Sequence, residues 1–138
     1  MQSSTTSSEA PRVLLVDDNE AMLARAASVL AGECVVVGAV KNAAAALEAA
    51  RTLEPDVIVL DISMPGTTGL EIASRLRKTG SKAAVVFLTV HDEHDFVEAA
   101  KAAGGIGYVV KRRLVSDLTV AVREARAGRP FISPIRTS

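Results

Sequence analysis

Five short apolar runs, each followed by a stretch of helical character, constrain the fold of this chain more than any other feature. The runs are VLLV (13–16), CVVVGAV (34–40), VIVL (57–60), AAVVFL (83–88) and YVV (108–110). Most are rich in β-branched residues and continuous rather than alternating, which is typical of strands buried on both faces of a parallel sheet. Because 49% of the residues are hydrophobic but only 3% are aromatic, the core must consist mainly of Val, Leu, Ile and Ala.

The segments between the runs carry helix periodicity and end at glycine or proline. We expect helices over residues 20–31, 43–54, 69–78, 92–103 and 116–127. Five βα units predict an α/β fold, a flavodoxin-like (βα)5 doubly wound sandwich. Right-handed crossovers leave few topologies, and we expect a parallel sheet of order 2-1-3-4-5.

One domain is expected over residues 12–128, preceded by a disordered Ser/Thr-rich arm over 1–11. Residues 129–138 are interpreted as the start of a linker or a C-terminal tail. The 16 basic and 16 acidic residues balance, which argues against a general nucleic-acid or membrane binder. The chain lacks the apolar centre of a signal peptide and the ~20 apolar residues of a membrane span, so we expect a cytoplasmic protein. The one cysteine, Cys34, is expected to be a small buried hydrophobe.

Polar residues follow four of the five runs directly. They are Asp17 and Asp18, Asp61, Thr89, and Lys111. Taken singly, each has an ordinary reading as a turn residue, a helix cap or a solvated strand end. In doubly wound sheets, however, ligands bind outside the carboxyl ends of the strands, near the switch in strand order. Their recurrence at successive strand ends therefore predicts one shared site.

Three carboxylates in one shallow pocket repel each other unless a cation is present. Oxygen ligands together with a few waters suit Mg²⁺. With Mg²⁺ bound, the three carboxylates and Lys111 would sum to zero charge. The site is thus electrostatically able to hold a phosphoryl group on one carboxylate.

The motifs VLLVDDNE, PDVIVLDISMPGTTGLE, VVFLTVHDE and GYVVK resemble the receiver domain of two-component response regulators. The resemblance covers roughly residues 12–128. Within that family the segments DISMPG, AAGGIGYVVK and AVREARAGRPFISP are similar to those of LuxR/NarL-type regulators.

The resemblance implies that Asp61 is the phosphoacceptor, which takes a phosphoryl group from a phosphohistidine on a sensor histidine kinase. The product would be an acyl phosphate. Asp18, Asp61 and the backbone carbonyl of Ser63 would bind Mg²⁺ directly, and Asp17 would help through a bound water. No catalysis is implied beyond the protein's own phosphorylation and dephosphorylation.

The resemblance also implies a switch. Lys111 and Thr89 would bind the phosphoryl oxygens, and Tyr108 would rotate inward together with Thr89. The surface around the fourth helix, fifth strand and fifth helix would then control homodimerisation or an output domain. Contact with DNA is expected only through such a domain, which this chain does not contain, and no membrane contact is expected.

Two alternative functions were weighed. A Mg²⁺-dependent phosphatase with an aspartyl nucleophile typically has a second Asp two residues later, but Asp61 is followed by Ile62 and Ser63. A receiver-like interaction module that is never phosphorylated, stand-alone or otherwise, would be expected to lack one of the site residues, and none is missing.

Several positions depart from the common receiver pattern or have a second reading. Arg112 follows Lys111 where many receivers have proline, and Val90 follows Thr89 where a smaller residue is common. Ser63 and His91 occupy positions that tune dephosphorylation in this family. The sequence HDEH superficially resembles a metal-ligand spacing, but no further cluster accompanies it. The basic run KRR is interpreted, apart from its lysine, as a solvated face or an interface salt bridge.

Overall fold

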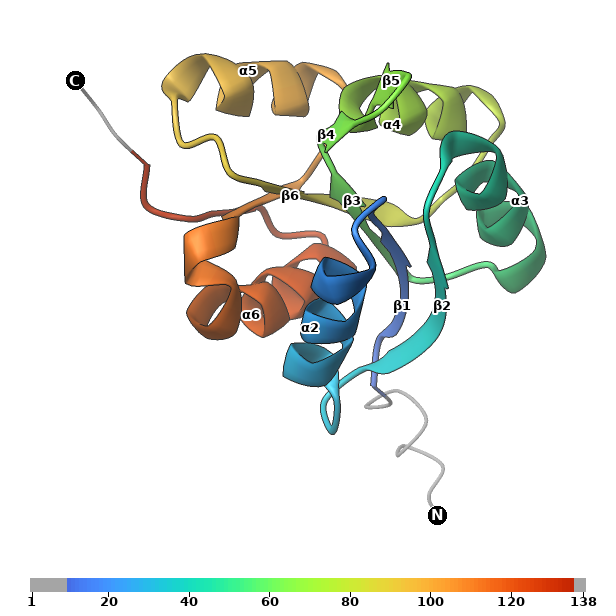
Figure 1. The fold of residues 1–138 in the computed structure, drawn as a ribbon, viewed down its shortest axis with the longest axis horizontal. Coiled ribbons are helices and arrows are strands. Elements are labelled where there is room, and N and C mark those ends of the chain that lie inside the picture. Colours follow the sequence, from blue (N-terminus) through green and yellow to red (C-terminus); the bar gives the residue numbers. More distant parts are fainter. Residues whose placement is uncertain (1–9, 136–138) are drawn as a thin grey trace.

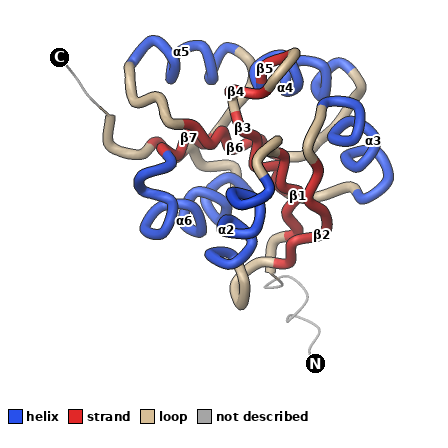
Figure 2. Tube along the Cα trace, viewed as in Figure 1, coloured by secondary structure: helices blue, strands red, loops and turns tan. Residues whose placement is uncertain are grey.

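A computed structural model describes residues 10–135 of the chain, and the expected N-terminal arm lies almost wholly outside the described residues. Figures 1 and 2 show a sheet covered by helices on both faces. The strands of the main sheet are β1 (Arg12–Val16), β2 (Val35–Val40), β3 (Val57–Asp61), β6 (Ala84–Thr89), β7 (Gly107–Val110) and β8 (Phe131–Ile132). A separate antiparallel pair consists of β4 (Ser63–Met64) and β5 (Thr67–Thr68).

The main sheet is parallel and has the order β2-β1-β3-β6-β7-β8. Its first five strands confirm the expected order 2-1-3-4-5. The switch in strand order lies between β1 and β3, which pair through Val16 and Leu60 at their carboxyl ends. The predicted site therefore starts from two adjacent strand ends.

Two helices cover one face of the sheet and three cover the other (Figure 1). The first face carries α2 (Glu20–Leu30) and α6 (Leu114–Arg126); the second carries α3 (Ala43–Leu53), α4 (Gly69–Lys78) and α5 (His94–Ala102). Local signals set several helix starts: the side chain of Asn42 accepts a hydrogen bond from Ala45 N at 2.8 Å, as an N-cap does. None of the helices in residues 10–135 is long and apolar enough to cross a membrane.

Successive strand residues are buried on opposite faces, which explains the continuous apolar runs. Val13 and Val57 pack in the cluster under α2 and α6, whereas Leu14 and Ile58 pack under α3, α4 and α5. All four are fully buried. Cys34 is buried as a small hydrophobe, as expected.

The structure departs from the sequence analysis at both edges of the sheet. Strand β2 is half-exposed rather than buried on both faces, with Val35 52% exposed, because it is an edge strand. At the other edge, residues expected to form a linker or tail instead contain β8, which pairs in parallel with β7. Residues past 128 thus contribute a strand to the sheet, and the predicted domain boundary stays a prediction.

Gly69, the first residue of α4, allows the chain to pass close to the site. Its N–H donates to the carbonyl of Ile62 at 2.7 Å, and a Cβ at this position would fall on the Asp61 carbonyl oxygen. The helix can therefore start directly beneath the end of β3 only if this residue has no side chain.

We expect Gly69→Ala to lower the free energy of unfolding by about 1–3 kcal/mol, because the backbone around Asp61 must shift to admit the methyl group. Urea unfolding followed by circular dichroism measures the change. Gly38→Ala is the control, since a Cβ there would meet only the side-chain ends of Leu14 and Leu53, at 3.1 Å. Equal losses in the two variants would contradict the close-approach argument.

Candidate functional site

Three carboxylates meet at the carboxyl ends of β1 and β3, where the sequence analysis placed them. One carboxylate oxygen from each of Asp17, Asp18 and Asp61 lies within 4.8 Å of the others. Asp17 and Asp61 are only 3% and 4% exposed, whereas Asp18 is exposed. The cluster thus has two buried members against the sheet and one member open to solvent.

Backbone N–H groups in the following loops partly stabilise the buried carboxylates. Asn19 N donates to Asp17 Oδ1 at 2.9 Å, and Ser63 N approaches Asp61 Oδ1 at 3.4 Å. The loops after both strands therefore fold back toward the preceding aspartate. The role of the Ser63 carbonyl as a metal ligand stays a prediction.

Lys111 supplies a positive charge from the far side of the site. It follows β7 directly, and its Nζ lies 3.5 Å from Asp17 Oδ2 and 3.4 Å from Asp61 Oδ1. Its side chain is only 19% exposed, so the interaction is shielded from solvent more than a surface ion pair. The topology thus unites residues 17, 61 and 111 in one constellation.

The positive charge of Lys111 does not balance the negative charges of the three carboxylates. Burial, and after it the negative charge of Asp17, raise the pKa of Asp61 to about 6 against the opposing effects of Lys111 and the Ser63 N–H. The carboxyl group at the centre of the site is therefore poorly stabilised as an anion by the protein alone.

The donor set fits a hard divalent cation. Asp17 Oδ2 is buried and has no hydrogen-bond partner among residues 10–135, and Lys111 Nζ is too distant for a strong bond. Such an orphaned oxygen within a cluster of three carboxylates is what a cation with oxygen ligands would satisfy. These residues can thus hold a metal ion of the Mg²⁺ type.

Thr89 and Tyr108 lie on the neighbouring strands β6 and β7, and both are buried, at 1% and 2% exposure. Thr89 Oγ1 accepts a hydrogen bond from His91 N at 3.1 Å, and the Tyr108 hydroxyl donates to His91 O at 3.0 Å. Burial, together with the negative charges of Glu93 and Asp92, raises the pKa of Tyr108 to about 12, so its hydroxyl remains a donor. The main chain of His91 therefore connects the two side chains predicted to form the switch.

The sequence analysis missed an ion pair at the rim of the site. Arg112 Nη1 lies 3.0 Å from Asp92 Oδ2, which joins the loop after β6 to the 3₁₀ turn after β7 (Lys111–Arg113). Helix α5 was expected to begin at Asp92, but it begins two residues later, at His94. The unusual basic residue after Lys111 was the only signal for this pair.

His91 stacks on Phe96 with ring centroids 4.0 Å apart, and neither histidine of HDEH joins the carboxylate cluster.

Comparison with known proteins identifies the arrangement. The family model of the response regulator receiver domain matches residues 13–123. The chain belongs to this family. It is 33% identical over 134 residues to the nitrate/nitrite response regulator protein NarL of Escherichia coli (strain K12), covering 95% of this chain and 62% of that protein. The chain spans about three fifths of the length of such curated relatives.

Solved receiver structures have the same fold. A LuxR-family two-component response regulator from Aurantimonas sp. SI85-9A1 matches with a TM-score of 0.86 and 29% identity, covering 91% of each chain. The signal receiver domain of the NarL response regulator from Mycobacterium tuberculosis matches with a TM-score of 0.78 and 34% identity, covering 88% of this chain and 99% of that one. The LuxR/NarL character expected from the motifs is thereby confirmed.

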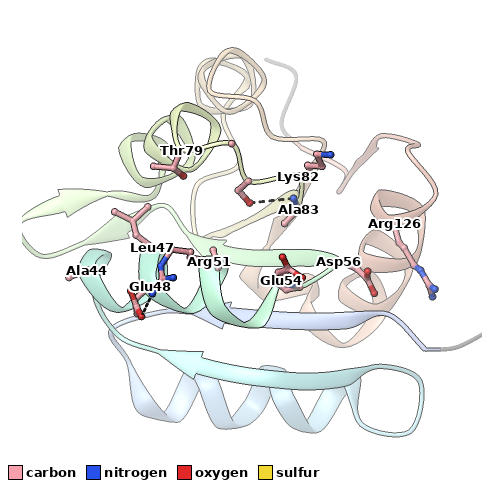
Figure 3. Close-up of a pocket in the computed structure, with 14 residues that line it drawn as sticks. Ala44, Leu47, Glu48, Arg51, Glu54, Asp56, Thr79, Lys82, Ala83 and Arg126 are labelled. Carbon is pink, nitrogen blue, oxygen red and sulfur yellow. Dashed lines mark hydrogen bonds and ion pairs between the residues drawn. The ribbon is translucent and has the colours of Figure 1, made fainter.

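The receiver also has a groove of about 970 Å³ far from the carboxylates (Figure 3). Its lining includes residues 54–56 before β3 and 79–83 before β6, which places it at the amino ends of the strands. Acidic and basic side chains are mixed along it, and Arg51 pairs with Glu48 at 2.6 Å. The groove has no charge preference and is not part of the site.

We expect Asp61→Asn to raise the free energy of unfolding of metal-free receiver by about 1–3 kcal/mol at about pH 7.5. Because the Asp61 pKa is raised in the folded state, stability from this group is full below 3.8 and is lost as the pH rises through about 6. Urea unfolding in the presence of a chelator, at neutral pH and below about pH 4, measures the difference. A gain that persists at the acidic pH would contradict this origin; Asp95→Asn, on the exposed face of α5, is the control.

Proposed function

We propose that this receiver accepts a phosphoryl group on Asp61 from a phosphohistidine of a sensor histidine kinase and thereby switches an output surface. The observation that carries the proposal is the buried Asp61 carboxylate, which has a second buried carboxylate and the Lys111 ammonium beside it. Family membership supports the same reading.

The proposed transfer joins one oxygen of Asp61 to phosphorus. A carboxylate oxygen of Asp61 attacks phosphorus while the phosphorus–nitrogen bond of the phosphohistidine breaks, and the electron pair remains on the imidazole nitrogen, which takes up a proton. The product is an acyl phosphate, which water later hydrolyses. Lys111 Nζ, 3.4 Å from Asp61, would pair with the phosphoryl oxygens.

Asp18, Asp61 and the Ser63 carbonyl would hold Mg²⁺, with Asp17 assisting through water. When bound, the ion supplies positive charge that offsets the carboxylates and the incoming phosphoryl group. The raised pKa of Asp61 and the orphaned oxygen of Asp17 support a requirement for this charge. Without it, the like charges at the strand ends would oppose the approach of a phosphate dianion.

The switch is proposed to run through Thr89, His91 and Tyr108. If the Thr89 hydroxyl turns toward a phosphoryl oxygen, its hydrogen bond with His91 N must change. The carbonyl of the same residue, His91, accepts the hydrogen bond from the Tyr108 hydroxyl, so a shift of His91 would reach Tyr108 directly. The shift would spread to α5, β7 and α6, which correspond to the expected fourth helix, fifth strand and fifth helix. We propose that this surface mediates homodimerisation or contact with a DNA-binding output domain in the cytoplasm.

Acetyl phosphate with Mg²⁺ is expected to add one phosphoryl group to the receiver, measured by intact mass. The adduct should be absent after chelation and in Asp61→Asn, because each removes a group the transfer requires. Asp95→Asn is the matched control and should be modified like the wild type. Absence of an adduct, together with absence of beryllofluoride binding, would instead favour the interaction module that is never phosphorylated.

Beryllofluoride, which mimics the phosphoryl group, is expected to shift the backbone amide resonances of His91 and of residues along α6. Tyr108→Phe should reduce the α6 shifts at saturating ligand, because it deletes the hydroxyl that bonds to the His91 carbonyl. Heteronuclear NMR of both proteins tests this. If the shifts in α6 were the same in the two proteins, the Tyr108 hydroxyl would have no part in the switch.

A further inference from the structure

A second buried polar cluster lies at the C-terminal end of the described chain, away from the three carboxylates. Asp117 on α6 is 5% exposed, and Ser133, which follows β8, is 1% exposed. Ser133 Oγ donates to Asp117 Oδ2 at 2.7 Å. Arg113 Nε donates to the same oxygen at 2.8 Å, and Ser116 Oγ donates to Oδ1 at 2.9 Å.

Ser133 also bonds to the strand that precedes Lys111. Its hydroxyl accepts a hydrogen bond from Val110 N at 3.2 Å, and its own N–H donates to Tyr108 O at 2.8 Å. Ser133 therefore binds the main chain of the switch tyrosine and of the residue next to the phosphoryl-binding lysine. It contacts both from the edge of the sheet opposite to β6.

These hydrogen bonds stabilise the docking of β8, which its own strand pairing would not maintain. A parallel pairing of two residues is far too short to be stable alone. A backbone bond from Phe131 N to Ile106 O at 3.1 Å and the packing of Phe131 on the core also hold the segment, whereas the exposed ion pair of Arg129 with Glu124 contributes little. Buried polar groups, by contrast, are costly unless paired, so the Ser133–Asp117 bond can form only when the segment is docked.

The state of Asp117 agrees with this arrangement. Burial raises the pKa of its carboxyl group, but hydrogen bonds from Arg113, Ser133 and Ser116 outweigh burial and leave the pKa below its usual value. The carboxylate is therefore an ionised acceptor when the hydroxyl of Ser133 reaches it.

We infer that Ser133, held by Asp117, is a positioning residue for the phosphoryl site: it docks β8 on β7 and thereby holds Tyr108 inward and orients the chain leading into Lys111. The inference rests on the proposed function of Asp61. It assigns to the segment after α6 a part in the switch, rather than the role of a passive connection.

The coupling must act in both directions. In this structure β8 is docked while Tyr108 is buried and bonded to the His91 carbonyl. A ligand at Asp61 that favours the inward position of Tyr108 would then strengthen the docking of β8. Loosening β8 would lower the affinity for that ligand by the same factor. Phosphorylation would thus control how firmly the end of the domain is held.

The test compares Ser133→Ala with Ser116→Ala in the full chain. Both remove one hydroxyl donor to Asp117, but only Ser133→Ala also removes the acceptor of the Val110 N–H on β7; the backbone bond from Ser133 N to Tyr108 O remains in both. Affinity for beryllofluoride with Mg²⁺ is measured by tyrosine fluorescence, which reports Tyr108 directly because the chain has one Tyr and no Trp. Hydrogen exchange of the Phe131 and Ser133 amides is measured with and without the ligand.

We expect Ser133→Ala to weaken beryllofluoride binding by about fivefold or more, and Ser116→Ala to match the wild type. In the wild type, the ligand should slow exchange of the Phe131 and Ser133 amides. Wild-type affinity in Ser133→Ala, an equal loss in Ser116→Ala, or unchanged exchange in the ligand-bound wild type would each overturn the inference. If the wild type itself did not bind beryllofluoride, the proposed function would fail first and the inference with it.

Discussion

Repulsion between two buried carboxylates is the constraint on which the site depends. Asp17 and Asp61 are brought together because they follow neighbouring parallel strands, and the single ammonium of Lys111 lies about equally far from both. Burial and the charge of Asp17 together raise the pKa of Asp61 despite this one positive charge. A metal ion could offset the imbalance, and the proposed phosphoryl transfer depends on such an offset.

The parallel sheet makes this arrangement possible at low cost. Two apolar layers bury almost every residue of β1 and β3, so the polar residues that follow them can lie only at the strand ends. Strand β7 then has two functions. Its carboxyl end delivers Lys111 to the carboxylates, and its open edge receives β8 through the buried pair Ser133 and Asp117. A change at the proposed phosphoryl site would therefore have a short path to the end of the described chain.

Most of the fold was predictable from the sequence. Continuous β-branched runs marked the five main strands, and glycine or proline after each helical segment marked the helix ends to within about two residues. The three carboxylates and Lys111 were placed together correctly, because parallel strands present their carboxyl ends at one edge. The prediction was wrong where burial depends on position in the sheet. The sequence of β2 is typical of a central strand, but β2 lies at the edge and is half-exposed.

Local pattern decided which residues form strands and helices and which polar residues stand at the strand ends, because both depend on neighbours along the chain. Three features depended on the tertiary structure: the pairing of β8 with β7, the bridge from Arg112 to Asp92, and the buried bond between Ser133 and Asp117. A strand of two residues has no periodicity to read, and the partners in the two side-chain contacts are 20 and 16 positions apart. Such contacts become visible only once the sheet and the helices have packed, since only packing determines which distant polar groups are buried together.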